Sequence, residues 1–261
     1  MIGLIQMIYF WFKNRSRAAV LKKWAAEQGL DFAVNAKTFT PPENPGKAED
    51  MSRYGARTKR TFGLVSRLLG ESKIQVHFPQ FMANRFRGDW QSEKNICWGT
   101  WNGMTVITWD TVYYDIRDSG NSKDWSEGEY SSVLILTDTP LHRTLITPNS
   151  LFKRVSSFGI EEGGGLFSTH AMKFELDEFN KAYRVKAKNE KWTYAIIDQA
   201  MIEWLLQNKN HSIEIATGGI LVSTWFTLTP SQTEEQLKFC ASFLEHIPED
   251  LKHHTLDGAA V

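Results

Sequence analysis

The residue types that carry catalysis or bind metals form no recognisable constellation in this sequence. The three glycines 163–165 follow Glu161-Glu162 and lack the Lys-Ser/Thr or GxGxxG context of a phosphate-binding loop. The seven histidines show neither HExxH nor HxH spacing, and no GxSxG nucleophile turn occurs. We therefore predict no catalytic residue, no cofactor and no metal site.

The cysteine content also limits the possible chemistry. Cys97 and Cys240 lie far apart in the sequence and belong to no CxxC pair. This excludes a disulfide framework and a cysteine-based zinc site, and it fits a reducing compartment.

Charge is unevenly distributed along a chain whose formal net charge is zero. Residues 1–70 carry twelve Lys/Arg and five Asp/Glu, a balance of +7, and the remaining residues have the opposite balance. A basic head on an acidic body favours an anionic partner for the head, either phospholipid or nucleic acid. The alternative is that the two parts complement each other. For nucleic acid the candidates are the basic residues between 53 and 67, but no recognisable binding module accompanies them, so this partner is not favoured.

The strongest functional signal is the opening segment, MIGLIQMIYFWFKNRSR. A secretory signal peptide places its positive charge before the apolar run, whereas here the charge follows it and no cleavage site is evident. A membrane-spanning helix needs about 20 apolar residues to cross the hydrocarbon core. The apolar run of this segment is shorter, so it is a poor spanning helix.

The order of aromatic and then basic residues in this segment is typical of a membrane interface. The predicted membrane-interface residues are Tyr9, Trp11, Phe12, Lys13, Arg15 and Arg17. The positive flank predicts that the rest of the chain lies on the cytoplasmic side, at the inner leaflet. The alternative is a helix packed into the core of a soluble cytoplasmic protein, since a helix that is apolar all round is buried either in protein or in lipid.

A tight hairpin is the clearest element of the remaining sequence. Asn102-Gly103 between alternating residues predicts a two-residue turn that places Trp101 opposite Met104, with Trp98 opposite Ile107. The same register places Ile96 opposite Trp109. Both faces of this hairpin are apolar, so it is either central in a covered sheet or presents an aromatic binding surface at Trp101 and Met104.

Further elements follow toward the C-terminus. Residues 16–28 predict a helix that could continue the apolar run, and residues 172–188 predict one or two strands. Residues 194–209 predict a single helix. A second hairpin about Gly218-Gly219 places Ile215 opposite Val222. A last helix begins at Thr229-Pro230, with Ser231 and Glu234 as its capping box.

This order of elements lacks a regular alternation of strand and helix, so it predicts an α+β fold with a mostly antiparallel sheet. A pleckstrin-homology-like barrel is the alternative. The expected organisation is an N-terminal apolar-basic helix over 1–30, a basic Pro/Gly-rich linker over 31–70, an α+β domain over 71–251 and a tail over 252–261.

The chain resembles a family of uncharacterised proteins of actinobacteria and their phages. The resemblance extends over roughly residues 16–250. The residues that carry it are Asn95, Gly99, Trp101, Gly103, Phe179, Val185, Ala195, Asp198, Met201, Trp204, Leu205 and Leu206. Members of that family typically begin with a membrane helix followed by a basic amphipathic helix. The resemblance thus implies an anchor, although the apolar run here is shorter, and it implies no activity.

Together these patterns favour a non-enzymatic, membrane-associated protein that acts through lipid contacts or through an unknown protein partner. One alternative is a soluble enzyme of unrecognised class with its site near the aromatic hairpin. The other alternative is a nucleic-acid-binding protein that uses its basic head.

Overall fold

A computed structural model describes residues 2–43, 74, 77, 78, 80, 81, 90–118, 123–149 and 170–253, with side chains placed over 15–43, 92–113, 128–149 and 171–252 besides the isolated positions. The helices are α1 (Ile2–Glu27), α6 (Asp177–Ala182), α7 (Glu190–Ile196), α8 (Gln199–Gln207), α9 (Pro230–His246) and α10 (Glu249–His253). The strands are β1 (Asp31–Asn35), β2 (Trp90–Trp101), β3 (Met104–Asp118), β4 (Lys123–Leu136), β5 (Thr144–Pro148), β6 (His170–Met172), β7 (Tyr183–Ala187), β8 (Ser212–Ala216) and β9 (Gly219–Ser223).

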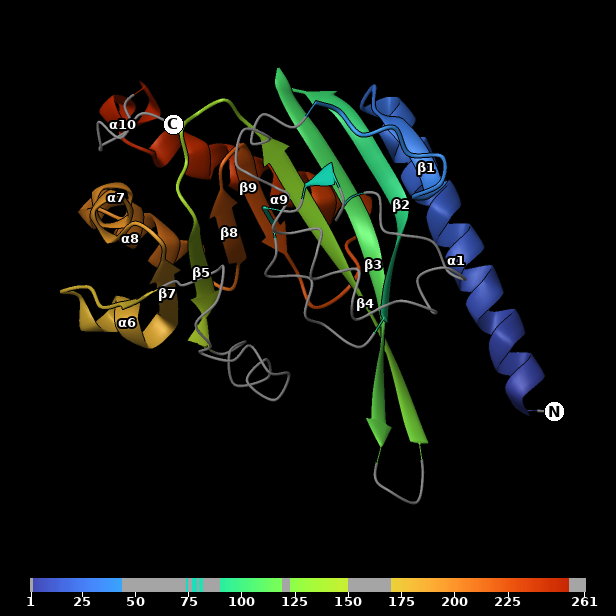
Figure 1. Cartoon of the computed structure of the whole chain (residues 1–261). Coiled ribbons are helices and arrows are strands. Elements are labelled where there is room, and N and C mark those ends of the chain that lie inside the picture. Colours follow the sequence, from blue (N-terminus) through green and yellow to red (C-terminus); the bar gives the residue numbers. More distant parts are fainter. Residues whose placement is uncertain are drawn as a thin grey trace.

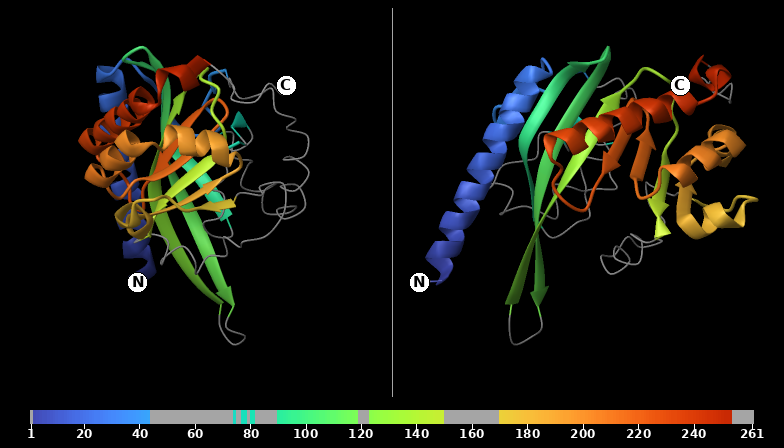
Figure 2. Two further views of the ribbon diagram at one scale, coloured as in Figure 1. Left: turned by 90° about the vertical axis from the view of Figure 1, so that its left-hand side faces the viewer. Right: turned by 180° about the vertical axis from the view of Figure 1, so that it is seen from behind.

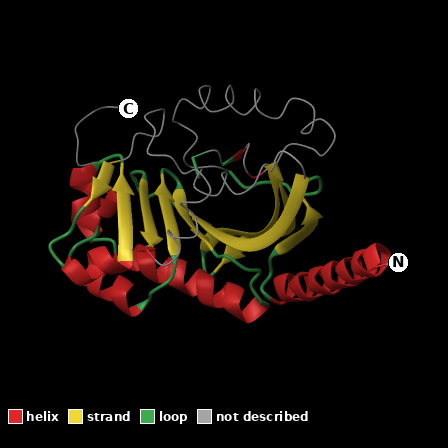
Figure 3. Ribbon diagram, turned by 90° about the horizontal axis from the view of Figure 1, so that it is seen from below, coloured by secondary structure: helices red, strands yellow, loops and turns green. Residues whose placement is uncertain are grey.

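The strands form one nine-stranded sheet in the order β1-β2-β3-β4-β9-β8-β5-β7-β6 (Figure 1). Each neighbouring pair is antiparallel. This confirms the predicted α+β class. The sheet is strongly curved at the β1–β4 end, but β1 and β6 remain at its two edges, so it is not the closed barrel of the alternative prediction (Figure 3).

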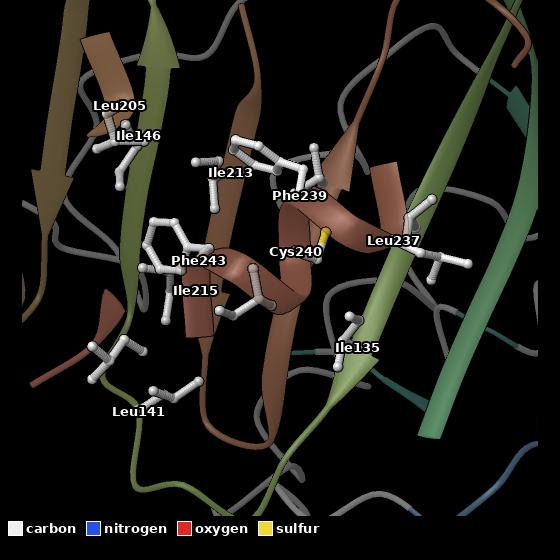
Figure 4. Packing of buried hydrophobic residues seen from close by; sticks show 14 of the residues in the cluster. Ile135, Leu141, Ile146, Leu205, Ile213, Ile215, Leu237, Phe239, Cys240 and Phe243 are labelled. Atoms are coloured by element: carbon white, nitrogen blue, oxygen red, sulfur yellow. The ribbon is translucent and has the colours of Figure 1, made fainter. Parts of the chain in front are cut away.

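The two faces of the sheet bury different clusters. The larger cluster lies under α1, α8 and α9, where Leu237, Cys240 and Phe243 of α9 pack over strands β4, β8, β9 and β5 (Figure 4). The smaller cluster lies on the opposite face and includes Phe39 and Phe78 from outside the sheet. Both faces are therefore covered, as a near-continuous apolar pattern in the central strands requires.

The β2–β3 hairpin turns where the sequence predicts it. Trp101 pairs with Met104 and Trp98 with Ile107, and Gly103 has a φ of +79°. Farther from the turn the predicted register is wrong. A β-bulge between Lys94 and Cys97 shifts the pairing, and Ile96 is not the registered partner of Trp109.

Other local predictions also need correction. The turn of the second hairpin is Thr217-Gly218, so Ile215 pairs with Ile220, because Gly219 belongs to a strand position where a Cβ would collide with the Ile135 carbonyl oxygen. The single helix over 194–209 is two, since the Asp198 side chain caps α8 by accepting from the Met201 N–H at 2.8 Å.

The capping box of α9 joins Thr229 to Gln232 instead of Ser231 to Glu234. The segment over 172–188 contains the short helix α6 in addition to strands. Within the segment expected to be a linker, β1 pairs with β2 and Phe39 is buried, so residues 31–39 take part in the sheet and its cover. Residues 44–70 and 254–261 lie outside the described residues.

The N-terminal helix is continuous from Ile2 to Glu27. Its C-terminal half lies on the same face of the sheet as α9, and its N-terminal half continues past the edge of the sheet (Figures 1 and 3). The ribbon formed by β3 and β4 also extends beyond the other strands toward this end of the molecule, and it diverges from α1 (Figure 2).

Candidate functional site

A buried polar cluster joins the N-terminal helix to the sheet. We call it the α1 junction, and it consists of Arg17 of α1, Asn95 of β2, Asp110 of β3 and Ser131 of β4. Arg17 and Asp110 make a bidentate ion pair, with 2.7 Å from Nε to Oδ2 and 2.8 Å from Nη2 to Oδ1. Only 2% of the Asp110 side chain and 16% of the Arg17 side chain is exposed. The pair is therefore largely desolvated, a setting in which it needs further hydrogen bonds to be stable.

Two side chains and one backbone group complete the cluster. Asn95 donates from Nδ2 to Asp110 Oδ2 at 2.8 Å, and the Ser131 hydroxyl donates to Oδ1 at 2.5 Å. The Leu228 N–H in turn donates to Ser131 Oγ at 2.9 Å. Each carboxylate oxygen thus accepts from the guanidinium and from one neutral donor, which compensates its loss of water.

The local backbone of β2 explains how Asn95 reaches the carboxylate. Asn95 lies in the β-bulge and has a φ of +53°, in the left-handed region that Asn adopts more readily than most residues. Bulges re-aim a side chain from its place in the ladder. Here the re-aimed amide is directed at Asp110, which pairs across the ladder with Lys94.

Apolar contacts continue the same helix face toward the C-terminal end of α1. Leu21, Trp24 and Ala25 are buried in the larger cluster, and with Arg17 they form a stripe at intervals of three and four residues. The C-terminal half of α1 is therefore fixed to the sheet by an apolar stripe and by the charged contact of Arg17.

The junction offers no reactive group. Burial raises the pKa of the neighbouring Cys97 thiol to about 12, so this side chain is a neutral thiol and a poor nucleophile. Both Asp110 oxygens are occupied by donors within the protein. No group of three or more potential metal ligands occurs among the described residues. What this arrangement can do is hold a helix at a defined place on a sheet.

The predicted site residues separate in the structure. The side chains of Tyr9, Trp11, Phe12 and Lys13 lie outside the described residues, and Arg15 is exposed. Arg17 points to Asp110, so its charge is used inside the protein and not at a membrane interface.

The possible binding surface on the first hairpin is a covered surface instead. Trp101 is buried in the larger cluster and Met104 packs against it. The aromatic content of this hairpin therefore reflects a central position in the sheet, which was the other reading of its two apolar faces.

Sequence reasoning missed Asn95, Asp110 and Ser131 as one site. Asp110 could have attracted notice as a carboxylate within an apolar strand, and Asn95 as an Asn just before the apolar run of β2. No local pattern links them to Arg17, because the ion pair joins positions 93 residues apart.

Comparison with known proteins adds little to this site. No protein-family model matches the chain, and no curated protein matches it. Among solved structures, the crystal structure of the mycobacterial trehalose monomycolate transport factor A, TtfA, aligns over 90% of this chain and 97% of that chain, at 13% identity and a TM-score of 0.48.

Proposed function

We propose that this protein is a non-enzymatic, membrane-associated protein, held at the cytoplasmic side of a bilayer by the N-terminal part of α1. The observation that carries the proposal is the division of this one helix. Its C-terminal half is attached to the sheet through the α1 junction, and its apolar N-terminal half continues beyond the sheet (Figure 3).

The length of the apolar part limits the mode of attachment. No helix in the part of the chain that the structure describes is long and apolar enough to cross a membrane. At about 1.5 Å per residue, the apolar residues before Lys13 span about 18 Å of a hydrocarbon core about 30 Å thick. The proposed attachment places the aromatic residues at the interface and the basic residues among the headgroups.

Basic side chains on the exposed surface of the same helix support an anionic lipid surface as the partner. Lys13 and Arg15 directly follow the apolar run, and Arg15 is exposed. Each basic residue near an anionic bilayer adds about 1 kcal/mol of attraction that salt weakens. We also propose that this chain is related to the uncharacterised proteins of actinobacteria and their phages that it resembles in sequence.

Flotation with vesicles tests the proposal. Replacing Ile5, Ile8 and Trp11 by Gln keeps the helix length and removes three apolar side chains, each worth about 1.5–3 kcal/mol of burial. We expect at least about 100-fold weaker partition into vesicles of neutral and anionic phospholipid. The exposed Tyr194 on α7, changed to Ser, is the matched control and should partition as the unmodified chain does. Equal partition of the Gln variant and the unmodified chain would exclude the proposal.

A further inference from the structure

The two edges of the sheet differ in how they are protected from pairing with another chain. The edge strand β6 has three residues, and the exposed Lys173 follows it. The other edge strand, β1, has five residues and contains no Pro, Lys or Arg, and its only charged residue is Asp31 at its first position. Short strands, Pro and Lys are common means by which edge strands avoid pairing with other chains. The β1 edge therefore lacks most of this protection.

The outer side of β1 has no strand partner in the described part of the chain, where it pairs with β2 alone (Figure 1). The helix that precedes it, α1, lies over one face of the sheet, since Arg17 reaches Asp110 on β3, two strands farther in. Phe39, which follows β1, packs on the opposite face against Trp98, with 5.0 Å between the ring centroids. The chain on both sides of β1 is thus attached to the faces of the sheet.

The same strand exposes an apolar side chain. Val34 is 56% exposed. Ala33 is buried in the smaller cluster, so the alternation of side chains along a strand places Phe32 and Val34 on the other face, the one that α1 covers. Phe32 is partly buried and packs against the larger cluster. An open edge therefore carries two apolar residues at alternate positions, one of them mostly exposed.

The sequence of β1 is complementary to a second copy of itself. In an antiparallel pair centred on Ala33, Val34 lies opposite Phe32 of the second copy, and Asp31 lies opposite Asn35 of the second copy. Each of these contacts occurs twice, because such a two-fold pair uses the same residues from both chains. Pairs of aromatic and β-branched residues across strands are stabilising. No like charges face each other in this register, and a formal net charge of zero leaves no overall repulsion between two copies.

We propose that two copies of this chain form a two-fold dimer through β1, which pairs antiparallel with β1 of the second copy about Ala33. This inference does not depend on the proposed function. Two five-residue strands bury less surface than a standard protein interface, so the expected dimer is weak, with a Kd on the order of 10 µM or higher. The two-fold axis is perpendicular to the sheet, so both copies of α1 lie on the same side of the joined sheet.

Cross-linking tests the register of the pair. Asp31 and Asn35 are exposed, whereas Cys97 and Cys240 are buried, so the native thiols do not compete for a thiol reagent in the folded chain. Opposite positions 31 and 35 lie about 5 Å apart, whereas the two copies of position 31 are separated by about 14 Å along the strands. A short bismaleimide should therefore cross-link a mixture of full-length D31C and N35C, and neither variant alone. Equal yields in all three samples would overturn the proposed pairing.

Sedimentation equilibrium without lipid measures the dimer itself. V34K places a charge beside the centre of the contact, and F226K introduces the same charge at a side chain of equal exposure, 56%. We expect V34K to weaken dimerisation at least about 10-fold and F226K to change it less than about twofold. The melting temperature of both variants should stay near that of the unmodified chain, because both positions are exposed.

The same measurement in the chain with Ile5, Ile8 and Trp11 changed to Gln separates this inference from the proposed function, because that variant removes association through α1. A dimer that persists in this variant and is weakened by V34K supports the β1 contact, whatever the result with vesicles. A chain that stays monomeric at ten times the expected Kd, or a dimer that V34K leaves unchanged, would overturn it even if α1 binds vesicles as proposed.

Discussion

Two buried ion pairs in this protein look alike and serve different parts of the fold. Arg143 donates from Nη2 to Glu214 Oε1 at 2.7 Å, with side-chain exposures of 11% and 3%, close to those of Arg17 and Asp110. Glu214 lies between Ile213 and Ile215 of β8, which belong to the larger cluster, so its side chain points to the opposite face of the sheet. The two ion pairs therefore lie on opposite faces of the sheet.

The difference lies in what else holds the arginine. Arg143 directly precedes β5, and its neighbour Thr144 pairs with Ile215 in the backbone ladder between β5 and β8. The main chain thus fixes Arg143 independently of its ion pair. Arg17 belongs to a helix that makes no ladder with the sheet, so the position of α1 depends on side chains. One pair strengthens a contact that already exists, and the other determines where an element lies.

The largest expected effect comes from removing either carboxylate. Asp110→Ala and Glu214→Ala each remove a carboxylate that contacts a buried guanidinium, which costs about 3–5 kcal/mol. Chemical denaturation measures this loss. Hydrogen exchange separates the two variants, because Asp110→Ala should lower the protection of α1 amides below that of α9, whereas Glu214→Ala should lower both together. Equal patterns of amide protection in the two variants would show that the two ion pairs do not differ in what they hold in place.

A double variant sharpens that result. Arg17→Ala with Asp110→Ala removes both charges, so it should be less destabilised than the sum of the two single variants by about 1–3 kcal/mol. Additive free energies of unfolding would mean that the pair is not energetically coupled in solution.

Changes at Asn95 should give the next largest effect. Asn95→Gly keeps the left-handed backbone and loses one hydrogen bond to a charged group, about 1.5–3 kcal/mol. Asn95→Ala adds the strain of a positive φ and should lose about 1 kcal/mol more. Thermal unfolding of both variants measures these two losses in the free energy of unfolding. Their comparison shows how much of the stabilisation by Asn95 comes from its backbone conformation in the bulge. Equal losses would mean that the stabilisation by Asn95 comes entirely from its side-chain amide.

A pH titration distinguishes the ion pairs from a partly buried histidine. His211 stacks on Phe239 and contacts the Gln236 amide at 3.1 Å; burial lowers its pKa from 6.5, and the Gln236 hydrogen bond opposes this shift. The unfolded chain therefore binds the proton more readily, so stability falls as pH drops through 6.5. Neither ion pair contains a histidine. His211→Phe should therefore weaken the dependence of the melting temperature on pH between pH 7.5 and 5.5. If the dependence of the melting temperature on pH is unchanged in this variant, groups other than His211 cause it.

The smallest effect should come from an exposed pair on α1 itself. Lys23 and Glu27 approach to 3.8 Å, with side-chain exposures of 80% and 58%. Removing such a pair costs about 0.3–0.5 kcal/mol, so Lys23→Ala should unfold almost as the unmodified chain does. A loss near that of Asp110→Ala would show that α1 is held by its surface charges.

Local sequence signals predicted the parts of the fold that depend on local chemistry. Asn102-Gly103 gave the turn and the register of the first hairpin near it, because only a few residues adopt the required backbone. The prediction then lost the register at Asn95, since a bulge depends on what its side chain meets across the sheet. In the second hairpin two adjacent glycines left two possible turn positions, and the choice depends on Gly219 lying against β4.

The candidate site was less predictable than the fold. The helix over 16–28 follows from periodicity, but Arg17 was assigned to a membrane interface because nearby basic residues share that pattern. Its true partner is 93 positions away, and only the folded sheet brings the two together. Long-range pairing of buried charges leaves no periodic trace in a sequence.

The α1 junction also has a mechanical consequence. Asp110 receives hydrogen bonds from β2, β4 and α1, and Ser131 extends the cluster to the segment that begins α9. A force applied along α1 is shared at this point among three adjacent strands and a second helix. These elements are loaded in shear together. Detaching α1 therefore requires several hydrogen bonds to break at the same time instead of in sequence.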